Sequence, residues 1–166
     1  MGFIARLLGA VPKDERDGIR LNEAEPWRVG STKDVERFLR ALPLLMPEGS
    51  IAYFEGTGEP HVAEYLRGVS IPAQSRVAMG TIWPRPDSYH VPVTAPTCEA
   101  FAEFLERRPA GYVCSHCHVY RDSLVLLEWH DAFTSDPIYL SRTIDGDAVA
   151  RFAQALGSSF ATGWTG

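Results

Sequence analysis

The residue types best suited to metal or proton chemistry gather in one short stretch, in which Cys114, His116, Cys117 and His118 occupy four of five consecutive positions. The letters CSHCH match C-x-x-C-H, the pattern of covalent c-type haem attachment. Such attachment requires an oxidising compartment. The N-terminal apolar run is interrupted by Arg6, unlike the hydrophobic region of a signal peptide. We therefore expect no haem, free thiols and a cytoplasmic location.

The spacing of these residues limits what they can bind if the stretch is a strand. Cys114 and Cys117 are three positions apart, so they would point to opposite faces and could not converge on one ion. His116 and His118 are two positions apart and would share a face. This spacing chelates a metal when a neighbouring strand adds a third ligand. The following apolar stretch, residues 124–130, is the expected partner strand of a hairpin.

The length of the hairpin turn decides what the histidines face, because a register change of one residue moves every side chain to the other face. A turn of two residues, at 121–122 or 122–123, pairs even-numbered with odd-numbered positions. The histidines then face a packing surface made by Val125, Leu127 and Trp129. The sequence RDSL slightly favours this turn, since it offers no glycine for the left-handed position of a three-residue loop.

A turn of three residues gives a different site. Even-numbered positions then pair with even-numbered ones, and Cys114, His116 and His118 share a face with Glu128 and His130. That set could hold zinc through the three histidines, with Glu128 as a general base. The expected role of the histidines is structural, as half-buried sheet residues, and the zinc site is the alternative.

A second candidate region is the loop at 83–89. Trp83, Arg85 and Tyr89 belong to residue types that are enriched at binding hot spots, and two prolines between them would pre-order the loop. We expect these three residues to contact a partner. The glycines of the segment 55–59 are a weaker candidate for anion binding, because glutamates flank them and would repel phosphate.

Composition predicts an ordinary globular domain over residues 1–166, with an N-terminal apolar segment plus loop at 1–30 and a tail at 157–166. The net charge is −5, and Lys and Arg form no basic stripe, which argues against nucleic-acid binding. No apolar run approaches the roughly 20 residues of a membrane span. The apolar residues of 2–11 fit one helical face, which we expect to pack on the domain or on a partner, including a second copy of the chain.

The periodicity of apolar residues predicts four helices, at 31–43, 60–69, 95–109 and 145–156. Six strands are predicted, at 50–56, 75–83, 88–94, 112–120, 124–130 and 137–142. Adjacent strands joined by short loops indicate an α+β fold, with a largely antiparallel sheet of about six strands covered by about four helices.

No G-x-S-x-G elbow and no cysteine in a nucleophile context occurs. The favoured hypothesis is therefore a non-enzymatic cytoplasmic binding or interaction domain without a cofactor. The alternative is a metal-dependent, zinc-type enzyme that uses the hairpin histidines.

Overall fold

The computed structural model of the chain describes residues 18–81 and 84–164. Within these residues the fold is α+β, with four helices and one antiparallel sheet of seven strands. The helix predicted at 2–11 lies outside the described residues, and so does Trp83. No helix in the described part of the chain has both the length and the apolar character that a membrane crossing requires.

The sheet has the strand order β3-β2-β4-β5-β6-β1-β7, and every neighbouring pair is antiparallel. Its strands, in chain order, are β1 (Trp27–Val29), β2 (Ile51–Glu55), β3 (Ser88–Pro92), β4 (His116–Arg121), β5 (Leu124–Trp129), β6 (Ile138–Leu140) and β7 (Phe160–Thr162). The longest strands, β2 to β5, adjoin one another and form the part of the sheet that carries the histidines.

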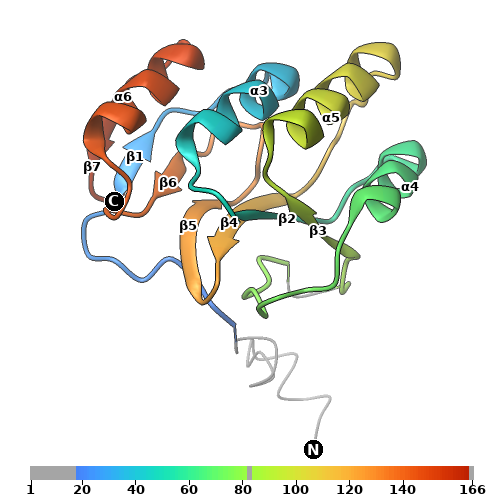
Figure 1. The fold of residues 1–166 in the computed structure, drawn as a ribbon, viewed down its shortest axis with the longest axis horizontal. Helices are drawn as coiled ribbons and strands as arrows, with labels where there is room; N and C mark the ends of the chain where they lie inside the picture. Colours follow the sequence, from blue (N-terminus) through green and yellow to red (C-terminus); the bar gives the residue numbers. More distant parts are fainter. Residues whose placement is uncertain (1–17, 82–83, 165–166) are drawn as a thin grey trace, which may run out of the picture.

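The helices cover one face of the sheet, as Figure 1 shows with the sheet below them. They are α3 (Val35–Leu45), α4 (Pro60–Val69), α5 (Ala95–Arg107) and α6 (Gly146–Ala155). Their apolar faces bury Phe38, Leu66, Phe101 and Phe152 against inward-facing strand residues such as Trp129. Because this core is apolar throughout, it supplies most of the hydrophobic stabilisation of the fold.

Two irregular segments cover the opposite face of the sheet, one after Gly18 and one after α4 (Figure 1). Leu21 from the first segment and Val77 from the second pack against Tyr53 and Tyr120 of the sheet. The two segments also bond to each other, since the Ile19 N–H donates to the Arg76 carbonyl at 2.8 Å. This second apolar cluster is smaller and is made largely of tyrosines and aliphatic residues.

Several predicted boundaries are wrong. The segments expected to be a loop and a tail contribute β1 and β7, which pair with each other at one end of the sheet. The strand predicted at 75–83 does not form over 75–81, because backbone groups of Arg76 and Ala78 bond to Ile19 rather than to the sheet. α3 continues through Pro43 to Leu45, since the Met46 N–H still reaches the Leu42 carbonyl at 3.1 Å.

Candidate functional site

The hairpin of β4 and β5 has a two-residue turn at 122–123, as predicted, but the predicted consequence is wrong. A β-bulge interrupts the ladder: Tyr120 pairs with Val125, whereas Val119 pairs with Leu127. Leu126 is the extra residue, and beyond it even-numbered positions face even-numbered ones. The bulge therefore produces the arrangement that the sequence assigned to a three-residue turn.

The bulge places Glu128 opposite His118 and extends a row of polar and aromatic side chains across five strands. Directly paired positions run His90, Tyr53, His118, Glu128 and Tyr139, from β3 to β6. The Tyr53 ring stacks on the His118 ring with centroids 5.7 Å apart, and the His118 and His130 centroids are 5.0 Å apart. All these residues lie on the face that the helices leave uncovered.

His130 lies between Glu128 and His116. Its Nε2 is 2.8 Å from a Glu128 carboxylate oxygen, and its Nδ1 is 3.3 Å from the Nδ1 of His116. The Asp131 N–H donates to the same His116 Nδ1 at 3.2 Å, so that nitrogen is an acceptor. His130 must then supply a proton at both ring nitrogens, which makes it an imidazolium beside the Glu128 carboxylate.

The electrostatics of the site agree with this assignment. The hydrogen bond to Glu128 raises the pKa of His130 above its ordinary range, against the effect of burial. Burial lowers the pKa of His116, and the neighbouring His130 lowers it further, so His116 is the neutral partner. Burial alone would raise the pKa of Glu128, but hydrogen bonds from His130 and the Leu21 N–H outweigh it and leave this pKa lowered.

His118 is the most deeply buried histidine, with 2% of its surface exposed. Burial first, and then the neighbouring His130, lowers its pKa to about 3. Its Nδ1 accepts the Trp129 N–H at 3.3 Å. His118 is therefore neutral at physiological pH, and it is more deeply buried than the half-buried position expected from the sequence.

Two carboxylates, the buried Glu55 and the partly buried Glu128, hold the covering segments onto the sheet. Glu55, which has no exposed surface, accepts the Gly80 N–H at 3.0 Å, the Thr81 N–H at 2.7 Å and the Tyr53 hydroxyl at 2.8 Å. Glu128 accepts the Leu21 N–H at 2.8 Å. Each glutamate therefore fixes backbone of a different covering segment through charge-assisted hydrogen bonds.

The covering segment lies directly on the histidines. The His116 Nε2 is 3.1 Å from the Thr81 hydroxyl. A Cβ added to Gly80 would lie 2.5 Å from the Cδ2 of His116, so only glycine allows this approach.

The cysteines take no part in this cluster. Cys98, Cys114 and Cys117 are free and buried in the helix-side core. β4 begins only at His116, so Cys114 precedes the strand and does not share a face with His116 and His118 as the three-residue alternative supposed. Burial raises the pKa of Cys117 and Cys114, which keeps both thiols protonated.

The geometry restricts metal binding by the histidines. Among residues 18–81 and 84–164, no group of three or more His, Cys, Asp and Glu side chains is arranged to hold a metal ion. His116 and His118 each have a Nδ1 that accepts a backbone N–H. Glu128, expected as a general base, has both carboxylate oxygens in hydrogen bonds and instead orients His130.

A pocket of about 350 Å³ lies beside this cluster, between the second covering segment and strands β2 and β3. Tyr53 and His90 contribute the strand side of its lining, and Gln74, Arg76 and Arg85 contribute polar side chains from the loops. Its volume is within the range of about 300–1,000 Å³ that is typical of small-molecule sites.

Of the three residues expected to bind a partner, Trp83 lies outside the described residues, and the other two differ in exposure. Arg85 is exposed and lines the pocket. Tyr89 is buried, with 5% of its surface exposed, because it alternates with Ser88 and His90 and points toward the helix-side core. Its hydroxyl has no hydrogen-bond partner among the described residues. The expectation that Tyr89 presents itself to a partner is therefore wrong in this structure.

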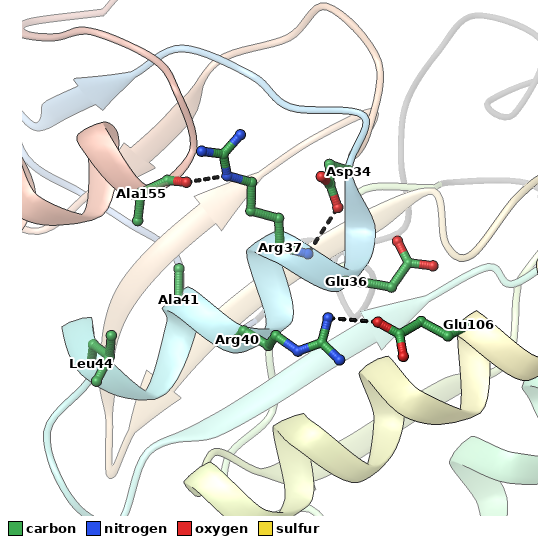
Figure 2. A pocket seen from close by; sticks show the side chains of 8 residues that line it. All are labelled: Asp34, Glu36, Arg37, Arg40, Ala41, Leu44, Glu106 and Ala155. Carbon is green, nitrogen blue, oxygen red and sulfur yellow. Dashed lines mark hydrogen bonds and ion pairs between the residues drawn. The ribbon is translucent and has the colours of Figure 1, made fainter.

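A larger depression of about 510 Å³ lies on the helix side, along α3 (Figure 2). Figure 2 shows Arg37 directed at the Ala155 carbonyl and Arg40 directed at Glu106. Arg40 also contacts Glu99 at 3.0 Å. Both arginines of this depression therefore have partners within the protein, whereas no ion pair is found among the described residues for the arginines of the smaller pocket.

Sequence reasoning found the three histidines and Glu128 but did not assign a role to Tyr53, Glu55 or His90. A signal for Glu55 is present in β2, where it ends an otherwise apolar stretch that reads IAYFE. A carboxylate at a buried strand position must be paired or hydrogen-bonded, and such a residue therefore holds other groups in place.

No protein-family model, no curated protein and no solved structure matches this chain.

Proposed function

We propose that this chain is a binding domain whose ligand occupies the pocket between residues 73–79, residues 85–88 and strands β2 and β3. The observation that carries the proposal is a concave site with two arginines, Arg76 and Arg85, for which no ion pair is found among the described residues. Unpaired charged side chains that converge on a pocket are available to a ligand at no cost in internal contacts.

The helix-side depression supports binding less well, although it is larger. Its lining carries Asp34, Glu36 and Glu106 as well as Arg37 and Arg40. A ligand there would compete with the existing contacts of both arginines, and exposed ion pairs of this kind add little specificity.

The pocket supports binding rather than nucleophilic catalysis. The Ser75 hydroxyl donates to the Asp122 carbonyl, and the His90 Nδ1 lies 2.9 Å from the Tyr120 hydroxyl. Neither serine of the lining is hydrogen-bonded to His90, so the described lining provides no activated nucleophile.

The proposal is tested by NMR of the ¹⁵N-labelled chain with five separate probes: phenol, benzamide, benzoate, benzylamine and phenyl phosphate. At least one probe should shift the backbone amides of 74–79 and 88–90. A Ser88→Trp variant, which fills the pocket from β3, should abolish these shifts. A Ser135→Trp variant, at an exposed loop away from the pocket, should retain them. The proposal fails if no probe shifts these amides or if Ser88→Trp leaves the shifts unchanged.

One observation favours a second candidate function, the metal-dependent enzyme. The 3.3 Å between the Nδ1 atoms of His116 and His130 equals the separation, about 3.3 Å, of two nitrogen ligands on a tetrahedral zinc ion, which would have to replace the proton that His130 donates to His116. Glu128 on the far nitrogen of His130 is a usual orienting partner for a ligating histidine. Elemental analysis of the purified chain tests this candidate. Stoichiometric zinc that is lost in His116→Ala/His118→Ala would support it, and its absence from both proteins would refute it.

A further inference from the structure

We infer that the ligand of this pocket is a small organic anion, with a carboxylate or phosphate head bound by Arg76 and Arg85 and an apolar or aromatic body. The inference rests on the proposed function and specifies its ligand class. Its starting point is charge: the pocket lining contains two arginines and no Asp or Glu, in a chain whose net charge is −5. A local excess of positive charge on an acidic protein attracts anions to that place.

Among the described residues, three acidic residues adjoin the pocket, and none has an ion pair with its arginines: Asp122 meets the pocket residue Ser75 only through its backbone carbonyl. Glu55 is buried behind Tyr53, and its oxygens accept hydrogen bonds from two backbone N–H groups and the Tyr53 hydroxyl. Asp87 is exposed beside the pocket residues Pro86 and Ser88 but does not line the pocket. No ion pair with a described residue therefore occupies either guanidinium group, and a carboxylate or phosphate group fits the forked donors of both.

The tautomer of His90 adds a neutral donor. The Tyr120 hydroxyl oxygen accepts the Gln74 N–H at 3.2 Å, and the only acceptor found for its own proton among the described residues is the His90 Nδ1. We assign the proton of His90 to Nε2, since burial lowers the pKa of this histidine and leaves it neutral. A pocket with two cationic donors and one neutral donor is suited to the several acceptor oxygens of an oxyanion.

The apolar part of the pocket lining indicates the chemistry of the other end of the ligand. Val77, Met79, Ala73 and Pro86 are apolar, and Tyr53 offers its ring because its hydroxyl is bonded to Glu55. A bare inorganic ion would leave these surfaces in contact with water. A molecule with a ring or short acyl chain would cover them and add hydrophobic stabilisation of the complex.

The same probe series tests the preference for an anion directly, because benzoate, benzamide and benzylamine have nearly the same shape and differ in charge. The Kd values obtained from the shifts of the pocket amides should be at least ten-fold lower for benzoate and phenyl phosphate than for benzamide or benzylamine. Arg76→Gln/Arg85→Gln should raise the Kd of both anions at least ten-fold. Arg67→Gln/Arg151→Gln, which removes the same charge from exposed helix positions, should leave binding unchanged at 150 mM salt.

The outcomes separate this inference from the proposed function. Equal affinity for benzamide and benzoate, with no loss in Arg76→Gln/Arg85→Gln, would overturn the anion inference while the binding pocket stands. Equal loss in both double variants would show a general charge effect and would also overturn it. No shift of the pocket amides by any of the five probes would overturn both.

Discussion

The two faces of the sheet differ in what covers them and in what they contain. The face under the helices is apolar, and its largest buried side chains include Phe38 and Trp129. The other face lies under two irregular segments and contains a buried glutamate, Glu55, a buried histidine, His118, and the His130–Glu128 pair. The contrast shows that hydrophobic stabilisation and polar chemistry are segregated to opposite sides of the same strands.

Strand β2 shows how the segregation arises from alternation. Ala52 and Phe54 belong to the helix-side core, whereas Ile51, Tyr53 and Glu55 face the covering segments. The helices need only apolar contacts to pack. The irregular segments have unpaired backbone groups, and the sheet must supply acceptors for them, which Glu55 and Glu128 do.

The largest expected effect concerns the helix-side core. Leu42 and Leu44 lie on the same helix, but Leu42 is 1% exposed and Leu44 is 83% exposed. Leu42→Ala should lower the free energy of unfolding by about 2–5 kcal/mol. Leu44→Ala should change it by less than about 0.5 kcal/mol. Urea unfolding of both variants checks this, and similar losses at the two positions would contradict it.

Replacement of Glu55 tests whether carboxylates hold the other cover. In Glu55→Gln the amide N–H₂ would face either the Gly80 N–H or the Thr81 N–H, so at least one hydrogen bond is lost in either orientation. The free energy of unfolding should fall by about 2–3 kcal/mol. Hydrogen exchange at the Gly80 and Thr81 amides should accelerate more than exchange in the helices. Glu48→Gln, at an exposed site, is the control, and protected amides at 80–81 in Glu55→Gln would refute the idea.

The pH dependence of stability should follow His118. Its pKa of about 3 in the folded chain lies below its ordinary value, so the unfolded chain binds the proton first and stability falls as pH falls below about 6.5. Between pH 7 and pH 5 this histidine alone should remove about 2 kcal/mol. His130 has a raised pKa and acts in the opposite direction.

The His118→Asn variant separates the effect of His118 on the pH dependence of stability from that of His130. Asparagine keeps an acceptor near the Trp129 N–H and does not titrate. The original chain should lose more stability than the variant between pH 7 and pH 5, as measured by urea unfolding. An equal loss in both proteins would show that His118 is not the group responsible.

The smallest expected effect concerns the charges on the helix side. Arg40 contacts Glu99 and Glu106, and these exposed contacts raise its pKa, yet all three side chains face solvent. Arg40→Gln should therefore leave the urea midpoint nearly unchanged at 0.5 M salt, where surface charges are screened. A loss as large as that in Glu55→Gln would remove the contrast between the two faces.

The fold class, the four helices within the described residues and five of the six predicted strands follow from apolar periodicity. Periodicity identifies an element when its apolar residues recur over many positions, as in α3 and α5. It misses β1 and β7, because their three residues are mostly not buried and give little apolar signal, whereas the equally short β6 reads IYL, is buried throughout and is predicted. The 75–83 stretch has strand-like composition, but bonding between the two covering segments determines its path.

The sequence identifies the histidine cluster as a set, but it attributes the assembly of the cluster to a three-residue turn that does not form. The sequence RDSL favours two residues, and the turn has two. The bulge at Leu126 depends on packing of both Leu126 and Leu127 into the helix-side core, which no local pattern encodes. Glu55 was noted only for its charge, since its partners, Gly80 and Thr81, are 25 and 26 residues away.

The bulge at Leu126 lets β5 contain one residue more than the stretch of β4 that it faces. In a regular ladder that kept Leu126, His118 would face Leu127, Trp129 would point at the covering segments and Glu128 would point into the apolar core. Deletion of Leu126 has the opposite result, because it would leave a regular strand in which every remaining residue keeps its present partner on β4. Along a lineage, this hairpin should therefore be able to shorten by this one residue and keep the histidine cluster, whereas a single deletion between Leu126 and the cluster would turn the cluster residues of β5 to the other face.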